Sequence, residues 1–248
     1  MKRVLRLVVI IDVILVCLLN VCGVDWTDMP YPAWAVFGVD TSKYTVRGVD
    51  VSEYQGNIDW EVLAGQDLDF AYIKATKGSG YRDKKFEYNW ENAGKTGLKI
   101  GAYHLFTFDE PAEEQAENFI LSVPCAKGML PPAVDVELYG KDRSDPPDVE
   151  QTVRMLTVFL DKLEAHYGQK PVIYATKKAY KLYMAGRFDG HPLWVRNPDS
   201  EPLLPDGRDW TFWQYNNDGE LKGYEGESRF IDLNVFRGTE EEFAEFIH

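Results

Sequence analysis

Strand-like and helix-like segments alternate along most of this chain, and this alternation constrains its fold more than any other feature. Eight short apolar runs are rich in β-branched and aromatic residues, and helical patterns separate the early ones. Repeated strand–helix–strand units favour parallel pairing with right-handed crossovers. We therefore predict an α/β fold, a single (β/α)8-type TIM-like barrel that is irregular in its last third. The runs cover residues 46–51, 70–75, 99–106, 132–137, 171–175, 192–195, 211–215 and 230–235.

Helix boundary signals support this pattern. Asn57 is a candidate N-cap for the first helix, and Gly97 and Gly168 are candidate stops. Thr239 and Glu242 have the spacing of a capping box. After the sixth run, the connections are too short and too rich in Gly, Pro and Asp for full helices. The helical patterns cover residues 59–65, 84–96, 110–121 and 148–167, and a last helix follows Thr239.

The first 23 residues differ in composition from the rest. Lys2, Arg3 and Arg6 precede an apolar run, which is typical of an export signal. Asp12 interrupts that run and no clear cleavage site follows, so residues 1–23 are either a signal peptide or a retained N-terminal membrane anchor. Residues 24–45 are expected to be a spacer, and residues 46–248 the barrel domain. We expect this domain to work outside the cytoplasm, either secreted or tethered by the N-terminal segment.

Charge and motifs exclude several classes of function. The net charge is -13, which argues against nucleic acid as a partner and against contact with an anionic membrane except through the N-terminal segment. The four histidines lack metal-ligand spacing, and we find no phosphate-binding loop, dinucleotide fingerprint or nucleophile elbow. We therefore expect no metal and no cofactor.

The fourth run ends in two acids, Asp135 and Glu137, that are one residue apart. Side chains alternate along a strand, so both point to the same face with Cα atoms roughly 7 Å apart. Like charges on a buried strand destabilise a fold, but glycosidases use such a pair, one carboxyl as acid and one to stabilise positive charge. The alternative is a strand end at which both acids are simply solvated.

A barrel places its functional groups at the carboxyl ends of its strands, and polar residues fall there in most runs. Trp213 and Tyr215 are two residues apart in the seventh run, so we expect both to face the barrel or its mouth. Acids, amides and aromatic rings at one mouth are typical of a sugar-binding site. The residues at the run ends are Asp50, Ser52, Tyr103, His104, Asp135, Glu137, Tyr174, Trp213, Gln214, Tyr215, Asp232 and Asn234.

Six motifs in order resemble glycoside hydrolase family 25, the Chalaropsis-type lysozymes. The resemblance spans residues 46–236. The motifs are Gly48-Val49-Asp50-Val51-Ser52-x-x-Gln55-Gly56, Ala71-Tyr72-Ile73-Lys74-Ala75-Thr76, Gly101-Ala102-Tyr103-His104-x-Phe106, Pro132-Ala133-Val134-Asp135-Val136-Glu137, Trp213-Gln214-Tyr215 and Ile231-Asp232-Leu233-Asn234.

The resemblance implies N-acetylmuramidase activity, the hydrolysis of β-1,4 bonds between N-acetylmuramic acid and N-acetylglucosamine. The implied partner is the glycan strand of peptidoglycan, and we expect the protein to act as a monomer. Glu137 corresponds to the catalytic acid of the family, and Asp50, Asp135 and Asp232 to its other active-site carboxylates. The expected substrate-binding residues are Tyr103, Tyr174, Trp213, Gln214, Tyr215, His104 and Lys74, although His104 could equally be a hydrogen-bonded wall residue.

For the mechanism, we expect Glu137 to protonate the leaving oxygen and Asp135 to stay ionised beside the anomeric carbon. The resemblance suggests retention of configuration, with Asp50 or Asp232 orienting the attacking group. That group is either a carboxylate or the N-acetyl oxygen of the substrate, and the spacing does not choose between them.

Two positions depart from the family pattern and bear on substrate fit. Lys77 stands where members often have Glu, and the sixth run continues from Trp194 as Val195-Arg196-Asn197-Pro198. A chitinase-like family-18 barrel is the nearest enzyme alternative, but Ala133 stands where that family has another acid. A non-catalytic glycan-binding barrel is the alternative from another class.

Overall fold

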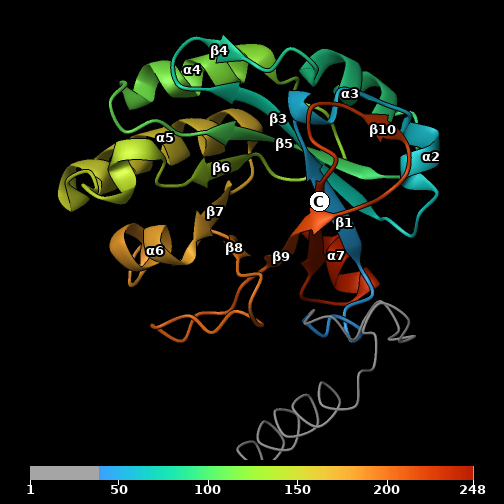
Figure 1. The fold of residues 1–248 in the computed structure, drawn as a ribbon. Coiled ribbons are helices and arrows are strands. Elements are labelled where there is room, and N and C mark those ends of the chain that lie inside the picture. The colour runs from blue at the N-terminus through green and yellow to red at the C-terminus, as the bar shows by residue number, and fades with distance from the viewer. Residues whose placement is uncertain (1–38, 248) are drawn as a thin grey trace, which may run out of the picture. The chain divides into compact units, whose positions relative to one another are not determined.

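The computed structural model describes residues 39–247, and all eight predicted runs are strands within it. Each strand pairs with the next one in this series, and the last pairs with the first, so the sheet closes. The predicted single barrel is therefore confirmed (Figure 1). The strands are β1 (Arg47–Val51), β3 (Phe70–Lys77), β5 (Lys99–Leu105), β6 (Ala133–Val136), β7 (Val172–Thr176), β8 (Leu193–Arg196), β9 (Phe212–Gly219) and β11 (Ile231–Phe236).

One strand runs against the predicted direction. β11 is antiparallel to both of its neighbours, β9 and β1, whereas the other barrel pairs are parallel. The prediction of parallel pairing is therefore wrong for this strand. A parallel return needs a crossover, usually a helix of a dozen or more residues. The connection from β9 to β11 contains only the short strand β10 (Tyr224–Glu225), which pairs with β2 (Asn57–Ile58).

The helices follow the predicted pattern with small shifts at their ends. Asp59 caps the first helix in place of Asn57, and the second ends at Gly94, before Gly97. Gly168 adopts φ 70°, the left-handed stop that was predicted, and the Thr239–Glu242 capping box is present. The helices are α2 (Trp60–Ala64), α3 (Phe86–Ala93), α4 (Ala112–Ser122), α5 (Val149–Tyr167) and α7 (Glu240–Phe246).

Short pieces replace regular helices elsewhere. Between β7 and β8 the chain forms only α6 (Lys177–Ala179) and the π-helical turn η5 (Tyr180–Met184), and no helix separates β8 from β9. The predicted irregular last third is therefore confirmed. The 3-10 turns η3 (Glu53–Gln55) and η4 (Gly140–Arg143) and the strand β4 (Tyr81–Arg82) lie in loops that follow β1, β6 and β3.

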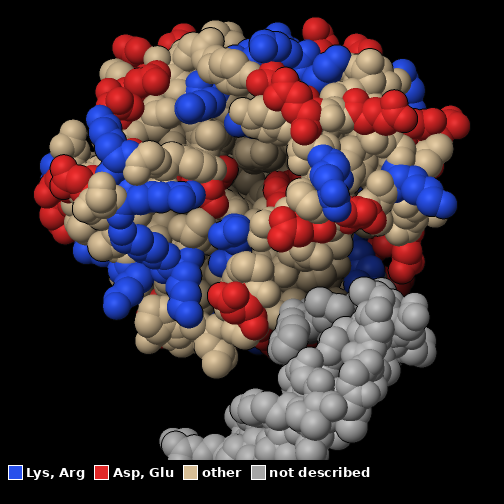
Figure 2. Space-filling view, in the orientation of Figure 1, with Lys and Arg blue, Asp and Glu red and all other residues tan. Residues whose placement is uncertain are grey.

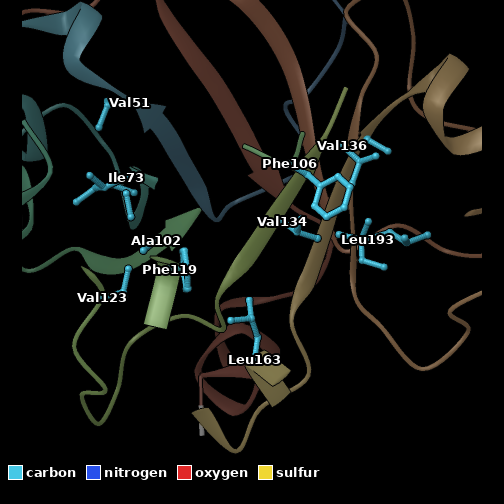
Figure 3. Packing of buried hydrophobic residues seen from close by; sticks show 14 of the residues in the cluster. Val51, Ile73, Ala102, Phe106, Phe119, Val123, Val134, Val136, Leu163 and Leu193 are labelled. Atoms are coloured by element: carbon cyan, nitrogen blue, oxygen red, sulfur yellow. The ribbon is translucent and has the colours of Figure 1, made fainter. Parts of the chain in front are cut away.

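Two apolar clusters stabilise the barrel. The larger lies between the strands and the surrounding helices and includes Val134 and Val136 of β6, Phe119 of α4 and Leu163 of α5 (Figure 3). The smaller cluster, the interior core, fills the barrel with alternate strand residues, and Phe243 of α7 packs against its Phe70 and Phe236. The larger cluster is called the outer cluster below. The interior is therefore a packed core rather than a pore. Its members include Phe70, Tyr72, Ala133, Val172, Tyr174, Trp194 and Phe212.

The end of the expected spacer packs on the barrel. Tyr44 is 6% exposed, and its ring lies 5.2 Å from Trp210 and 6.0 Å from Trp213 between centroids. The expected leader, and the spacer up to residue 38, lie outside the described residues. No helix within residues 39–247 has the length and apolar character needed to cross a membrane.

Candidate active site

Four carboxyl groups gather in one cavity at the barrel mouth. The cavity has a volume of about 740 Å³, and Asp50, Asp135, Glu137 and Asp232 all line it. Figure 2 shows a hollow in this face, with Asp and Glu atoms beside it and Lys and Arg atoms gathered along one side. Asp50, Asp135 and Glu137 are at or just beyond the carboxyl ends of β1 and β6, as the barrel prediction requires.

Asp232 reaches the mouth by a different route. It is the second residue of β11 and lies directly opposite Asp50 of β1 in the antiparallel register. The reversed direction of β11 brings the amino end of this strand to the mouth. The prediction that Asp232 lies at the carboxyl end of a strand is therefore wrong. Asp232 nevertheless lies at the barrel mouth, where it was expected.

Asp50 and Asp232 form a coupled pair. Asp50 Oδ2 accepts hydrogen bonds from Gln214 Nε2 and Asn234 Nδ2, both at 2.8 Å. Burial raises the pKa of Asp50 to about 6, and these two amides act against that rise. Burial, followed by repulsion from Asp50, raises the pKa of Asp232 to about 9. At neutral pH the pair therefore holds one proton, on Asp232, and Asp50 is the ionised partner.

Asp135 is buried beside Glu137. It is 9% exposed, and its Oδ1 atom is buried without a hydrogen-bond partner. Burial, followed by repulsion from Glu137, raises the pKa of Asp135 well above its usual range, and Lys74 opposes this rise. The direction runs against the expectation that Asp135 stays ionised. The protein thus leaves one buried oxygen of Asp135 without a hydrogen-bond partner.

A hydrogen-bond chain joins Glu137 to Asp50. The Tyr174 hydroxyl oxygen lies 3.0 Å from Glu137 Oε1 and 2.9 Å from Gln214 Oε1. Because Gln214 donates to Asp50 through Nε2, its Oε1 is free to accept from Tyr174. A hydroxyl carries one proton, so Tyr174 donates to Gln214 or to Glu137, but not to both. Glu137 and Asp50 are thus joined through two neutral side chains, Tyr174 and Gln214.

Four of the seven expected substrate-binding residues line the cavity: Lys74, Tyr103, Tyr174 and Gln214. Tyr174 is only 5% exposed and packs edge-on against Trp194, so its ring also belongs to the barrel core. Trp194 itself lines the cavity and donates from Nε1 to Asn234 Oδ1 at 2.8 Å. The core thus orients Asn234, which in turn holds Asp50.

His104 does not line this cavity. It is fully buried under α4, where Nδ1 lies 2.7 Å from Thr76 Oγ1 and Nε2 lies 3.1 Å from Gln115 Oε1. Burial lowers the pKa of His104 to about 4, so the ring is neutral at neutral pH. Since Tyr103 faces the cavity, the next residue must face outward. The structure thus places His104 in the barrel wall, hydrogen-bonded to Thr76 and Gln115, and not among the residues that line the cavity.

Trp213 and Tyr215 also face away from the cavity. Trp213 is fully buried in the outer cluster and donates from Nε1 to Asn197 O at 2.8 Å, and Tyr215 packs against the same cluster. The expectation that both face the barrel or its mouth is wrong. They do share a face, as predicted, but Gln214 between them is the residue that points inward.

Loop residues complete the site and were missed in the sequence, because loops carry no periodic signal. A second hollow of about 780 Å³ shares Tyr54, Lys74, Leu105 and Tyr139 with the first and is also lined by Lys77. Tyr54 and Tyr139 are 51% and 45% exposed, so the two hollows adjoin across exposed aromatic rings. The residues of the first hollow that come from loops and the turns within them include Tyr54, Tyr139, Arg143 and Phe230.

No group of three or more His, Cys, Asp or Glu side chains within residues 39–247 is arranged to hold a metal ion. The polar side chains that line the cavity are carboxyl, hydroxyl, amide and cationic groups.

A closed β/α barrel with four carboxyl groups in one polar cavity at its mouth defines a glycoside hydrolase. The chain belongs to glycosyl hydrolases family 25, whose model matches residues 49–224. The structure is similar to that of a family 25 glycosyl hydrolase from Bacillus anthracis, with 47% identity, a TM-score of 0.82 and coverage of 86% of this chain and 98% of that one.

Two curated relatives carry the name of an activity. Lysozyme M1 of Streptomyces globisporus is 31% identical over 217 residues, which cover 81% of this chain and 70% of that protein. The N,O-diacetylmuramidase of a Chalaropsis species is 28% identical over 212 residues, which cover 77% of this chain and 96% of that protein.

Proposed function

We propose that this protein is a lysozyme, an N-acetylmuramidase that hydrolyses the β-1,4 bond between N-acetylmuramic acid and N-acetylglucosamine in bacterial peptidoglycan. Family membership and the activities named for its relatives support this proposal. The observation that carries it is the placement of Asp135 and Glu137, on one face of β6, in the same cavity as Asp50 and Asp232. Peptidoglycan lies outside the cytoplasm, so the domain acts there.

The shape of the mouth suits a polymer of sugars. Two adjoining hollows form a groove longer than one sugar needs, and exposed tyrosines at their junction offer stacking faces. Hydroxyl, amide and carboxyl groups on the floor provide the hydrogen bonds that fix a sugar in one orientation. In this proposal Tyr103, Tyr174, Gln214 and Lys74 contact the substrate directly.

In the proposed mechanism, Glu137 donates its proton to the glycosidic oxygen as the bond from that oxygen to the anomeric carbon breaks. The pair Asp50–Asp232 carries one negative charge, which stabilises the positive charge that develops at the anomeric carbon. Asp135, which lines the cavity beside Glu137, binds a polar group of the substrate. The N-acetyl oxygen or a carboxylate then attacks, and water releases the product while Glu137 takes back a proton, with retained configuration.

The alternatives account for fewer observations. A family-18 chitinase would need an acid at Ala133, which is instead buried in the interior core. A barrel that only binds glycans would gain nothing from Asp50, Asp135 and Asp232, because burial raises the pKa of each and so makes ionisation costly. Catalysis uses such groups, whereas a binding site of neutral hydrogen-bonding residues would serve recognition equally well.

We further propose that residues 1–23 export the domain as a signal peptide or tether it as an anchor, and that the domain acts as a monomer. The basic and apolar order of the first residues supports export.

The test of the proposed function is the chemistry of the products. Purified protein is incubated with peptidoglycan, and the released fragments are reduced with borohydride and identified by mass spectrometry. A muramidase gives fragments in which the reduced terminal sugar is N-acetylmuramic acid. Terminal N-acetylglucosamine, or no release at all, would contradict the proposal. Cleavage of chitin oligomers at a much higher rate would favour the chitinase alternative.

A further inference from the structure

Two cationic side chains line the acidic cavity without an acidic partner. Arg143 ends η4, in the loop that follows β6, and Lys178 lies in α6, directly after β7. Both side chains line the cavity, and both residues are exposed. β6 and β7 are neighbours in the barrel, so their loops lie side by side at the mouth. In a chain of net charge -13, this placement of positive charge at the site is notable.

Backbone carbonyl groups, and no carboxylate, hold these two side chains. Arg143 Nε donates to Leu138 O at 3.1 Å, and Lys178 Nζ donates to Arg143 O. Neither forms an ion pair with any carboxylate in the part of the chain that the structure describes. A hydrogen bond to a backbone carbonyl orients a cationic side chain but does not neutralise its charge. Arg143 and Lys178 can therefore still bind an anion.

The other two cations of the cavity have a different role. The charge of Lys74 opposes the rise in the pKa of Asp135, and the charge of Arg196 opposes the rise in the pKa of Asp232. Each of these two cations therefore acts on one of the four acids. Arg196 also donates to Asn217 Oδ1 at 3.1 Å. Of the four cationic residues that line the cavity, Arg143 and Lys178 are therefore the two whose charge is available to a ligand. Figure 2 shows Lys and Arg atoms gathered along one side of the hollow.

The proposed substrate supplies anions close to the bond that is cleaved. The muramic acid ring carries a lactyl group, which ends in a carboxylate or continues into a peptide with carboxylates of its own. Arg143 lies six residues after the proposed acid Glu137 in the same loop, and both residues line the cavity in which the bond would be cleaved. We infer that Arg143 and Lys178 bind the carboxylates of this lactyl–peptide substituent, an inference that rests on the proposed function. This contact would favour glycan strands that contain muramic acid over strands that lack it.

The test compares two forms of one peptidoglycan preparation freed of phosphate polymers. In one form the peptide carboxylates are intact, and in the other they are converted to amides with carbodiimide and ammonia. The double variant Arg143→Gln/Lys178→Gln should show roughly tenfold lower kcat/KM than the wild type on the intact form, as expected for two charge contacts. On the amidated form the two enzymes should act at equal rates, because no charge is left to recognise.

Two further variants separate charge from structure. Lys127→Gln/Arg154→Gln removes the same net charge from exposed positions outside the cavity and should behave as the wild type on both forms. The charge-preserving Arg143→Lys/Lys178→Arg should keep its kcat/KM on the intact form within about threefold of the wild type. An equal loss on both forms, or no loss on the intact form, would overturn the inference.

A third substrate locates the anion. Glycan strands stripped of peptide by an amidase keep only the lactyl carboxylate. A loss by the double variant on these strands assigns the contact to the lactyl carboxylate, and equal rates there assign it to the peptide. If the wild type releases no fragments from any of the three substrates, the proposed function itself fails.

Discussion

A carboxyl group buried among other carboxyl groups retains its proton to a higher pH, and this cavity holds three such groups beside Glu137. Burial raises the pKa of Asp50, Asp135 and Asp232, and repulsion between neighbours adds to the effect. Between pH about 4 and these raised values, these three carboxyl groups bind more protons in the folded protein than in the unfolded chain, so their contribution to stability falls as pH rises. The site is therefore maintained at the expense of stability at neutral pH.

The variant Asp232→Asn should be more stable than the wild type at pH 8. Asn mimics the protonated carboxyl group, and the pKa of Asp232 is about 9. The free energy of unfolding should rise by at least about 1 kcal/mol at pH 8, and the difference should vanish near pH 4. Denaturant unfolding across this pH range measures it, with Asp161→Asn on the exposed face of α5 as the charge control. A difference independent of pH would contradict the coupling of Asp232 with Asp50.

The variant Tyr174→Phe should lower kcat about tenfold while leaving the melting temperature nearly unchanged. It removes only the hydroxyl that links Glu137 to Gln214 and keeps the ring in the interior core. Tyr174→Ala would confuse the two roles, since the loss of a buried ring costs roughly 3 kcal/mol or more of stability. Normal kcat in Tyr174→Phe would show that the hydrogen-bond chain has no part in catalysis.

The sequence predicted that the four acids lie at the barrel mouth, but it did not predict for every strand residue whether the side chain points inward or outward. Which face of a strand turns inward depends on register, and one inward residue fixes its neighbours. Tyr103 and Gln214 face the cavity, and alternation then turns His104, Trp213 and Tyr215 outward. A polar residue between two aromatic ones, as in Trp213-Gln214-Tyr215, could have indicated this arrangement.

At the scale of elements, hydrophobic runs predicted every barrel strand because strands buried on both faces are nearly continuous in apolar residues. The direction of a strand is not encoded in its own residues. It follows from the length of the connection, and the short segment between β9 and β11 leaves no room for a helical crossover. That reversal brings Asp232 opposite Asp50, so a loop length determines part of the active site.

The N-cap of α5 should contribute measurable stability. Asp148 Oδ1 accepts a hydrogen bond from Gln151 N at 2.8 Å, and α5 packs Leu156, Phe159 and Leu163 into the outer cluster. Asp148→Ala should lower the free energy of unfolding by about 1 kcal/mol. The matched change Asp161→Ala in the middle of the same helix should alter it by less than about 0.5 kcal/mol. Equal effects in the two variants would show that capping does not matter here.

At the scale of the whole molecule, residues 39 onward form one compact unit that contains the barrel and its site. The sequence placed the domain start near residue 46, because residues before it lack a period. Tyr44 nevertheless packs on Trp210 and Trp213, and its hydroxyl donates to Glu201 Oε1 at 2.5 Å. Contacts of this kind join residues far apart in sequence and leave no local pattern.

Three truncated chains test this boundary. A protein that begins at Val39 should unfold at the same denaturant concentration as one that begins near Asp25, and both should keep full activity. A protein that begins at Val46 loses the ring of Tyr44 and should be less stable by about 3 kcal/mol. Equal stability of the Val39 and Val46 proteins would show that residues 39–45 are indeed only a spacer.

In the proposed mechanism Glu137 is the general acid of a peptidoglycan hydrolase, and the variant Glu137→Gln probes this role. Gln keeps the size of the side chain and its contact with Tyr174 but has no proton to donate. We predict that kcat on peptidoglycan falls at least about 10²-fold, with an unchanged melting temperature, whereas Glu113→Gln on the exposed part of α4 has wild-type activity. Hydrolysis by Glu137→Gln at a near wild-type rate would contradict the account.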